Sequence, residues 1–462
     1  MVGGAALVMR RAVRFVDQRA GSAPLLRKAL RYVFPDHWSF LLGEIALYSF
    51  VVLVATGVYL TLFFEPSIKD TVYHGSYEPL QGRTISEAYR SVVDISFEVK
   101  AGLLIRQTHH WAADVFVVAI VLHLLRVFFT GAFRKPRELT WIIGVLMLMT
   151  ALLEGFLGYS LADDLLSGMG LAIAYSVVMS LPLVGANLAL LIWGAPFPGV
   201  PELWPRMYVF HVLVLPIAIG VLLSIHLALI VARHHTQFGG GRRTERRLVG
   251  LPLAPAYAPR TIGLALAVAS VLFLLGGLVQ INPIWLWGPY EVSQATNGAQ
   301  PDWYLGWLIG GLRLVPGFDV VIGDYTLVPN AFWGGVALPL SLFALLLSWP
   351  WLERLVTRDT AFHNILDRPR DRPWRTAIGA AVVSWVFLAF VSGSADRVDV
   401  LLHVPYRTQI WLYRVLLLAL PPATLLVTWR FCLALQQSER VEAEKRAAKA
   451  AGADASAPSP TV

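Results

Sequence analysis

Eight long runs of apolar residues divide this sequence, and they restrict its fold more than any other feature. A helix needs about 20 apolar residues to cross a bilayer, and each run approaches or exceeds that length. Inside lipid, backbone polar groups are satisfied only within helices or closed barrels. We therefore expect an all-α polytopic membrane protein with segments at 39–64, 107–130, 140–160, 207–232, 260–281, 331–350, 376–393 and 409–433.

Composition supports this class and excludes others. Hydrophobic residues make up 56% of the 462 residues, and the mean hydropathy is +0.60. The single cysteine, Cys432, excludes an intrachain disulfide, a cysteine-rich metal site and covalent haem attachment through Cys-x-x-Cys-His. A net charge of +8 could suit a nucleic-acid binder, but the basic residues cluster between apolar runs. Such clustering is typical of membrane topology, so we expect no nucleic-acid partner.

The basic loops predict the orientation of the chain. Arginines gather in 134–137, 233–247 and 351–375, whereas 161–205 contains no lysine or arginine. Because cytoplasmic loops carry the excess of basic residues, the eight segments place both termini in the cytoplasm.

The same pattern predicts five regions along the chain. The last region is charged and then rich in alanine, serine and proline, a composition typical of disorder. The regions are a basic cytoplasmic N-terminal segment (1–36), a four-helix core (37–235), a cytoplasmic linker (236–259), a C-terminal membrane region (260–437) and a disordered cytoplasmic tail (438–462).

Two of the apolar segments each carry a pair of histidines. His109 and His123 are fourteen residues apart, which is about 21 Å along a helix and within about 40° of one face. His211 and His226 are fifteen apart, or about 60°. His110 fails the same test, because thirteen steps place it on about the opposite face from His123. A single histidine in a membrane helix could simply donate a hydrogen bond to a neighbouring carbonyl. Two pairs with matched spacing instead favour two haems, each bound by two imidazoles.

Glycines repeat the histidine spacing in the neighbouring segments. Gly43 and Gly57 are fourteen residues apart, and so are Gly144 and Gly158. A flat macrocycle between helices needs small residues beside it, although ordinary helix packing also uses glycine.

Arginines flank the histidines near the predicted membrane surfaces, where cations could pair with haem propionates. They could also be topology markers. These arginines are Arg106, Arg126 and Arg206. Both histidine-bearing segments are predicted to run from the outer to the inner surface. The outer pair is therefore His109 and His211, and the inner pair is His123 and His226.

With these features the chain resembles cytochrome b, the quinol-oxidising core of cytochrome bc complexes, over nearly its whole length. Further shared motifs are Gly158-Tyr-Ser-Leu161, Leu181-Pro182 and Pro301-Asp-Trp-Tyr304. The stretches 35–48, 129–137 and 280–285 are similar to the actinobacterial branch, whose subunit is a fused eight-helix protein that serves menaquinol.

The resemblance implies a reaction. Quinol is expected to bind at an outer site built from the end of segment three, the 161–185 loop and the Pro-Asp-Trp-Tyr turn. One electron would pass to a Rieske protein, and the other through the outer and inner haems to an inner quinone. Asp302 would accept a proton and Tyr304 would bond the quinone. From spacing alone, Asp302 could equally be a helix-start carboxylate, and Tyr304 an interfacial anchor.

The sequence departs from the family at three positions. Asp302 stands where many members have glutamate, Ala162 where proline is usual, and Leu41 where some relatives attach a further haem through cysteine. We therefore expect two non-covalent b-type haems and no third. For the inner quinone site the candidates are Trp38, Ser39, Arg233 and His235.

The expected function is that of a translocase-type quinol–cytochrome c oxidoreductase subunit in the bacterial plasma membrane. The resemblance implies a Rieske protein, a cytochrome c subunit, a homodimer of complexes, a supercomplex with a terminal oxidase, and membrane lipid as partners. The alternatives are a di-haem anchor that relays electrons between a dehydrogenase and quinone, and a transporter whose histidines relay protons.

Overall fold

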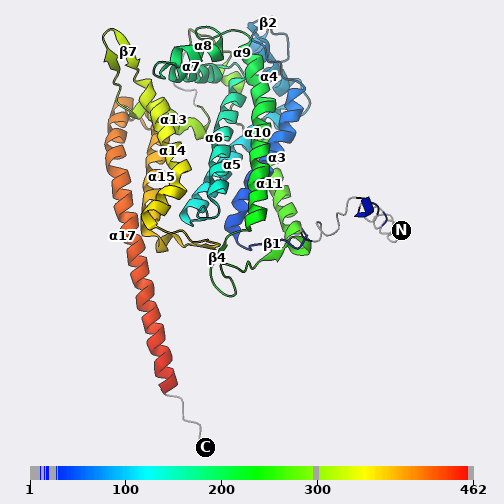
Figure 1. The fold of residues 1–462 in the computed structure, drawn as a ribbon. Coiled ribbons are helices and arrows are strands. Elements are labelled where there is room, and N and C mark those ends of the chain that lie inside the picture. The colour runs from blue at the N-terminus through cyan, green and yellow to red at the C-terminus, as the bar shows by residue number, and fades with distance from the viewer. Residues whose placement is uncertain are drawn as a thin grey trace, which may run out of the picture.

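Membrane-spanning helices dominate the computed structural model (Figure 1). It describes residues 31–294 and 301–455, together with residues 11, 15, 17–19, 28 and 30. Within these residues eight helical segments are long and apolar enough to cross a membrane, which confirms the predicted fold class. Most of the basic segment 1–36 lies outside the described residues.

The eight spans match the predicted runs to within seven residues at each end, except that the last extends much further. They are formed by η1 (Trp38–Phe40) with α3 (Leu41–Thr61), α5 (Gly102–Phe129), α6 (Glu138–Ser160), α9 (Leu203–Val209) with η3 (Phe210–Val214) and α10 (Leu215–Arg233), η4 (Leu253–Tyr257) with α11 (Ala258–Leu278), η5 (Trp333–Ala337) with α14 (Leu338–Thr357), α15 (Pro373–Gly393), and α17 (Tyr406–Ala455).

The helix α17 continues well beyond the bundle, so residues 438–455 are helical where composition predicts disorder (Figure 1). This stretch is rich in alanine, glutamate, lysine and arginine, which are strong helix formers. Glu439 pairs with Arg368 and Arg370 of the loop between α14 and α15, and Glu442 pairs with Arg446 one turn along the helix. Local propensity and these ion pairs therefore outweigh the low hydrophobicity of the segment.

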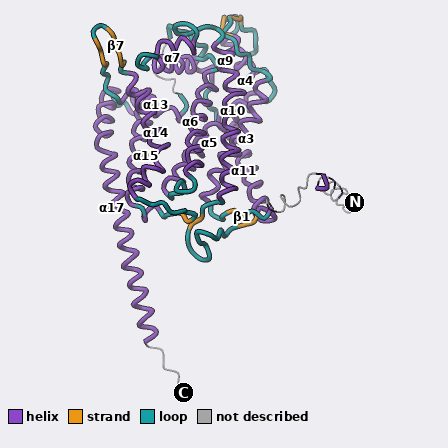
Figure 2. Tube along the Cα trace, viewed as in Figure 1, coloured by secondary structure: helices purple, strands orange, loops and turns teal. Residues whose placement is uncertain are grey.

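Short elements cover one end of the bundle (Figure 2). This end contains three connections that are too long to be simple turns, at 62–101, 161–202 and 279–332. Its elements are β2 (Asp70–Val72) paired with β3 (Thr84–Ser86), η2 (Glu78–Leu80), α4 (Glu87–Phe97), α7 (Leu165–Met179), α8 (Gly185–Trp193), α12 (Ile284–Trp287), α13 (Trp303–Leu314), β6 (Val320–Ile322) paired with β7 (Tyr325–Val328), and α16 (Ala395–Leu402).

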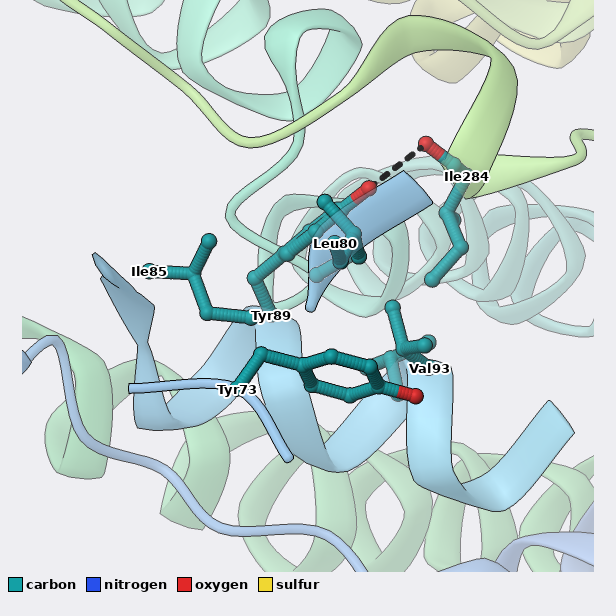
Figure 3. Close-up of a cluster of buried hydrophobic side chains, with 8 residues drawn as sticks. Tyr73, Leu80, Ile85, Tyr89, Val93 and Ile284 are labelled. Atoms are coloured by element: carbon teal, nitrogen blue, oxygen red, sulfur yellow. Dashed lines mark hydrogen bonds between the residues drawn. The ribbon is translucent and has the colours of Figure 1, made fainter. Parts of the chain in front are cut away.

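A buried cluster ties α4 to the start of the 282–330 connection (Figure 3). The Tyr89 hydroxyl donates a hydrogen bond of 3.3 Å to the carbonyl of Ile284. This contact anchors the connection that leads to the Pro-Asp-Trp-Tyr turn. The side chains labelled in Figure 3 are Tyr73, Leu80, Ile85, Tyr89, Val93 and Ile284.

The opposite end holds the arginine-rich loops. Here β1 (Val33–Phe34) pairs with β5 (Leu251–Pro252), and β4 (Gln237–Phe238) pairs in parallel with β8 (Ile365–Leu366), followed by η6 (Pro369–Asp371). Arg137 donates to the carbonyls of Arg233, His234 and His363, so one guanidinium connects three loops. Arginine in this region therefore stabilises structure as well as marking topology.

Most of the long helices, together with α13, form two groups. In the first, α3 packs against α5 and α6 packs against α10, while α11 covers α5. In the second, α13 lies beside α15, and α15 lies beside α17. The first group contains all four predicted haem ligands, and the second presents Asp302, which immediately precedes α13.

Glycine lets α13 and α15 approach backbone to backbone. A Cβ at Gly310 would overlap the carbonyl of Ala389, and a Cβ at Gly393 would overlap the carbonyl of Gly306. Membrane helices use small residues for such close contacts. The position of the Pro-Asp-Trp-Tyr turn therefore depends on this glycine interface.

We predict that Gly310→Ala destabilises the protein by about 1–3 kcal/mol, because the added methyl meets backbone that has no side-chain freedom to move. Gly263→Ala in α11 is the matched control, since a Cβ there meets no atom within 4 Å. Thermal unfolding of the purified protein should show a lower melting temperature for the first variant only. Equal melting temperatures would contradict the packing argument.

Candidate functional site

The predicted outer pair of histidines meets between α5 and η3. The ring centroids of His109 and His211 are 6.2 Å apart, with the ring planes at 80°. Two imidazole–metal bonds of about 2 Å each, with half a ring at either end, span about 6 Å. Nδ1 of His109 lies 2.9 Å from Oγ1 of Thr56, and Nδ1 of His211 lies 3.0 Å from Oε1 of Glu154. These contacts leave Nε2 of each ring for a metal.

A π-helical turn explains the unequal spacing of the two pairs. His211 lies in η3, where the chain makes a π-helical turn before Pro216. Such a turn accommodates one extra residue, and Pro216 has no N–H to continue the regular bonding pattern. The interval of fifteen from His211 to His226 therefore behaves like the interval of fourteen in α5.

Each predicted glycine lies against one predicted ligand. A Cβ at Gly57 would lie 3.2 Å from Cε1 of His109, and one at Gly43 would lie 3.2 Å from Cε1 of His123. At Gly158 the distance to Cε1 of His211 would be 2.6 Å, and at Gly144 the distance to Cε1 of His226 would be 3.7 Å. The glycines of α3 and α6 thus leave space for the imidazoles of α5 and of the α9–α10 span.

Two of the three predicted arginines have an unsatisfied buried nitrogen. Nη2 of Arg106 and Nη2 of Arg126 have no hydrogen-bond partner among the described residues. Arg106 otherwise donates to Ser96, and Arg126 to Ser39, at opposite ends of α5. An unpaired guanidinium nitrogen suits a carboxylate such as a haem propionate. Arg206, by contrast, lies exposed on α9.

Taken together, these residues fit two haems held without covalent attachment. The fit rests on paired imidazoles, glycines beside them, and a guanidinium with a free buried donor near each pair.

One continuous cavity joins the outer histidines to the Pro-Asp-Trp-Tyr turn. Its lining includes His109 and His211 together with Tyr159, Asp302 and Tyr304. The end of α6 and the turn before α13 therefore face the same space as the predicted outer haem ligands. A flat, mostly apolar molecule with two hydroxyl groups could bind there.

Asp302 is the N-cap residue of α13, but its side chain makes no capping bond to the described residues of that helix. Instead Oδ1 lies 2.7 Å from Nε2 of His110, and Oδ2 accepts a bond of 2.9 Å from the Tyr304 hydroxyl. Burial raises the pKa of Asp302, but the charge of His110 and the bonds from His110 and Tyr304 lower it by more. The helix-start role is therefore not the one its side chain performs.

Ala162, where the resemblance leads us to expect proline, lies in the lining of the cavity. Its N–H donates to the carbonyl of Tyr159 at 3.4 Å, a bond that proline could not make. The next residues are buried, and burial raises the pKa of Asp163 to about 7 and of Asp164 to about 6. The chain leaving α6 is thus held by packing and backbone bonds.

Comparisons with known proteins agree with this geometry. The family model described as "Cytochrome b(N-terminal)/b6/petB" matches residues 114–289. The cytochrome bc1 complex cytochrome b subunit of Mycobacterium tuberculosis is 47% identical over 434 residues, which is 94% of this chain and 78% of that protein. The subunit of Streptomyces coelicolor is 43% identical over 442 residues, or 95% and 80%.

The chain belongs to the family of bc1-complex cytochrome b subunits. Membership confirms the predicted family and its actinobacterial branch. A solved hyperthermophilic respiratory Complex III chain has the same fold, with a TM-score of 0.67 at 20% identity, covering 90% of this chain and 98% of that one.

The predicted inner quinone residues of this cytochrome b are only partly brought together. Ser39 bonds Arg126, and His235 packs against Phe40. Burial, with nearby cations, lowers the pKa of His235 to about 4, so its imidazole is neutral at neutral pH. Trp38 is 70% exposed, and the backbone carbonyl of Arg233 accepts a hydrogen bond from Arg137.

Three contacting residues were missed by sequence reasoning. Thr56 and Glu154 contact the Nδ1 atoms of the outer histidines, and His110 contacts Asp302. For His110 a signal existed: the helical rotation that excludes it as a haem ligand turns it toward another face of α5. For Thr56 and Glu154 there was no such signal, because a single polar residue in a long apolar segment does not form a repeating pattern.

We predict that Gly158→Ala disturbs the outer haem, because the added methyl would lie 2.6 Å from the His211 ring. Gly144→Ala is the matched comparison, since its methyl would make an ordinary 3.7 Å contact with His226. Haem content per chain should fall toward one for the first variant and stay at the wild-type value for the second. Equal haem contents would count against the assigned packing.

Proposed function

We propose that this chain is the quinol-oxidising subunit of a bc1-type quinol–cytochrome c oxidoreductase, a translocase that contributes to the proton motive force. The observation that carries the proposal is the single cavity shared by His109, His211, Asp302 and Tyr304. With a haem between His109 and His211, the part of the cavity beside Asp302 and Tyr304 would remain for the quinol, so an electron acceptor and a proton acceptor would lie next to one substrate. Relatives of 43–47% identity named as bc1 subunits support the same function.

At the outer site, quinol binds in the cavity between the end of α6 and the turn before α13. Asp302 accepts the hydroxyl proton of the quinol as it loses an electron. Burial raises the pKa of the Tyr304 hydroxyl well above its ordinary value, so Tyr304 stays protonated. Its single O–H donates to Oδ2 of Asp302 in this structure, and it would turn from that oxygen to the quinone oxygen to bond the substrate. Packing against Gly155 holds the Tyr304 ring in place.

Two residue sets would hold the b-type haems: His109 and His211 with Arg106, and His123 and His226 with Arg126. When bound, each haem supplies a one-electron carrier. The protein keeps the four imidazoles at two depths, and Gly43, Gly57, Gly144 and Gly158 keep space beside them. Arg206, exposed on α9, is a propionate partner only if its side chain turns toward the bundle.

The remaining assignments follow from the bc1 family and from topology. The second electron is used at an inner quinone site that includes Ser39 and His235, with Trp38 and Arg233 at its edge. The arginine-rich end faces the cytoplasm of a bacterium, so both termini are cytoplasmic. The substrate is menaquinol, and the partners are a Rieske protein, a cytochrome c subunit, a second complex and a terminal oxidase.

Replacing Asp302 tests the outer site. Asp302→Asn removes the proton acceptor but keeps the size of the side chain, so quinol oxidation should slow by about 10²- to 10⁴-fold. Steady-state cytochrome c reduction by the purified complex measures this, and absorption spectra should show both haems still present. An unchanged rate would remove Asp302 from the mechanism.

Replacing a ligand tests the haem assignment. His211→Leu removes one ligand of the outer pair, so the chain should keep the inner haem and lose the outer one. Haem content should fall from two to about one per chain, with one of the two potentiometric steps lost. A variant that kept both haems would show that His211 is not a ligand. Loss of both haems would show that the two sites do not fill independently.

A further inference from the structure

His110 connects the haem-bearing helix to the quinol site. It lies in α5 next to His109, and a rotation of about 100° per residue separates the two side chains. His109 faces Thr56 and His211, whereas Nε2 of His110 lies 2.7 Å from Oδ1 of Asp302, 192 residues further along the chain. The side chains of His110 and Asp302 are each only 13% exposed.

Both oxygens of the Asp302 carboxylate have a partner. His110 holds Oδ1, and the Tyr304 hydroxyl donates to Oδ2. The partners come from α5 and α13, so the carboxylate cannot rotate freely toward α13, where its capping bond would form. Tyr304 is itself only 2% exposed and lies against Gly155. Of the two partners, only His110 belongs to the helix that carries the haem ligands.

The length of the Asp302 side chain makes this contact important. Aspartate has one rotatable bond between its Cβ and its carboxyl group, so its oxygens occupy a narrow set of positions. A short carboxylate at the wall of a cavity can present one oxygen to a substrate only if the other is held. The bond from His110 performs that task in this structure, and the lining of the cavity includes both residues.

We propose that His110 is a positioning residue of the outer quinol site, which holds Oδ1 of Asp302 so that Oδ2 faces the quinol beside Tyr304. The inference rests on the proposed role of Asp302 as proton acceptor. His110 acts through Asp302 and need not touch the quinol. It is also not a haem ligand, so its effect on turnover should be separable from haem binding.

The test compares variants of similar volume that differ in hydrogen bonding. His110→Leu fills the space without a donor, and His110→Gln keeps an N–H that can reach Oδ1. Cytochrome c reduction is measured with a soluble menaquinol analogue on the purified complex. We expect kcat to fall by about 10- to 100-fold in His110→Leu, since small misplacements of a catalytic group have effects of this size. His110→Gln should recover most of that loss.

A double variant provides the readout that a merely structural role would not produce. If His110 acts only through Asp302, His110→Leu should slow Asp302→Asn no further. Haem content and reduced spectra should stay at wild-type values in all these variants. His74→Ala is the matched control, because His74 is an exposed histidine in an outer loop. It should leave the rate unchanged.

The outcomes separate the inference from the proposed function. Multiplicative losses in the double variant, or equal rates for His110→Leu and His110→Gln, would overturn the positioning role. A wild-type rate in His110→Leu together with a slow Asp302→Asn would overturn this inference alone. A wild-type rate in Asp302→Asn would overturn the proposed role of Asp302 itself. His110→Met replaces His110→Leu if the latter assembles poorly.

Discussion

Contact between imidazole rings and bare helix backbone is the constraint on which this structure depends. Four of the histidines inside the bundle, those predicted to bind haem, each lie against a glycine of α3 or α6. A side chain at any of these glycines would crowd the ring beside it, by amounts that differ from a severe overlap at Gly158 to ordinary contact at Gly144. The helices of the first group can therefore lie as close as they do because glycine, the smallest residue, stands opposite each imidazole ring.

The second group of helices places the quinol chemistry beside this core. Glycines bring α13 onto the backbone of α15, and the buried cluster around Tyr89 anchors the start of the connection that precedes it. As a result Asp302, which is remote in sequence from every haem ligand, shares a cavity with His109 and His211. Proximity of the proposed electron and proton acceptors is thus a property of packing between the two groups.

Regular patterns made much of this arrangement predictable. Helices in lipid must satisfy their own backbone, so apolar length predicts the spans. A period of 3.6 residues predicts which side chains share a face, so spacing alone identifies the pairs His109 with His123 and Gly43 with Gly57. The end of α17 was not predictable in this way, because helix propensity and the ion pairs of Glu439 outweigh a composition typical of disorder.

The sequence alone determined the spans, the four histidines with their facing glycines, and the motif that contains Asp302, since each depends on local composition or on a fixed helical period. Only the tertiary structure decided what those residues contact. It showed the π-helical turn at His211, the nitrogens of Arg106 and Arg126 that have no partner within the described part of the chain, and the contact of His110 with Asp302. The reason is physical: these features depend on how separate helices rotate and slide against one another, and no periodicity within a single segment records that.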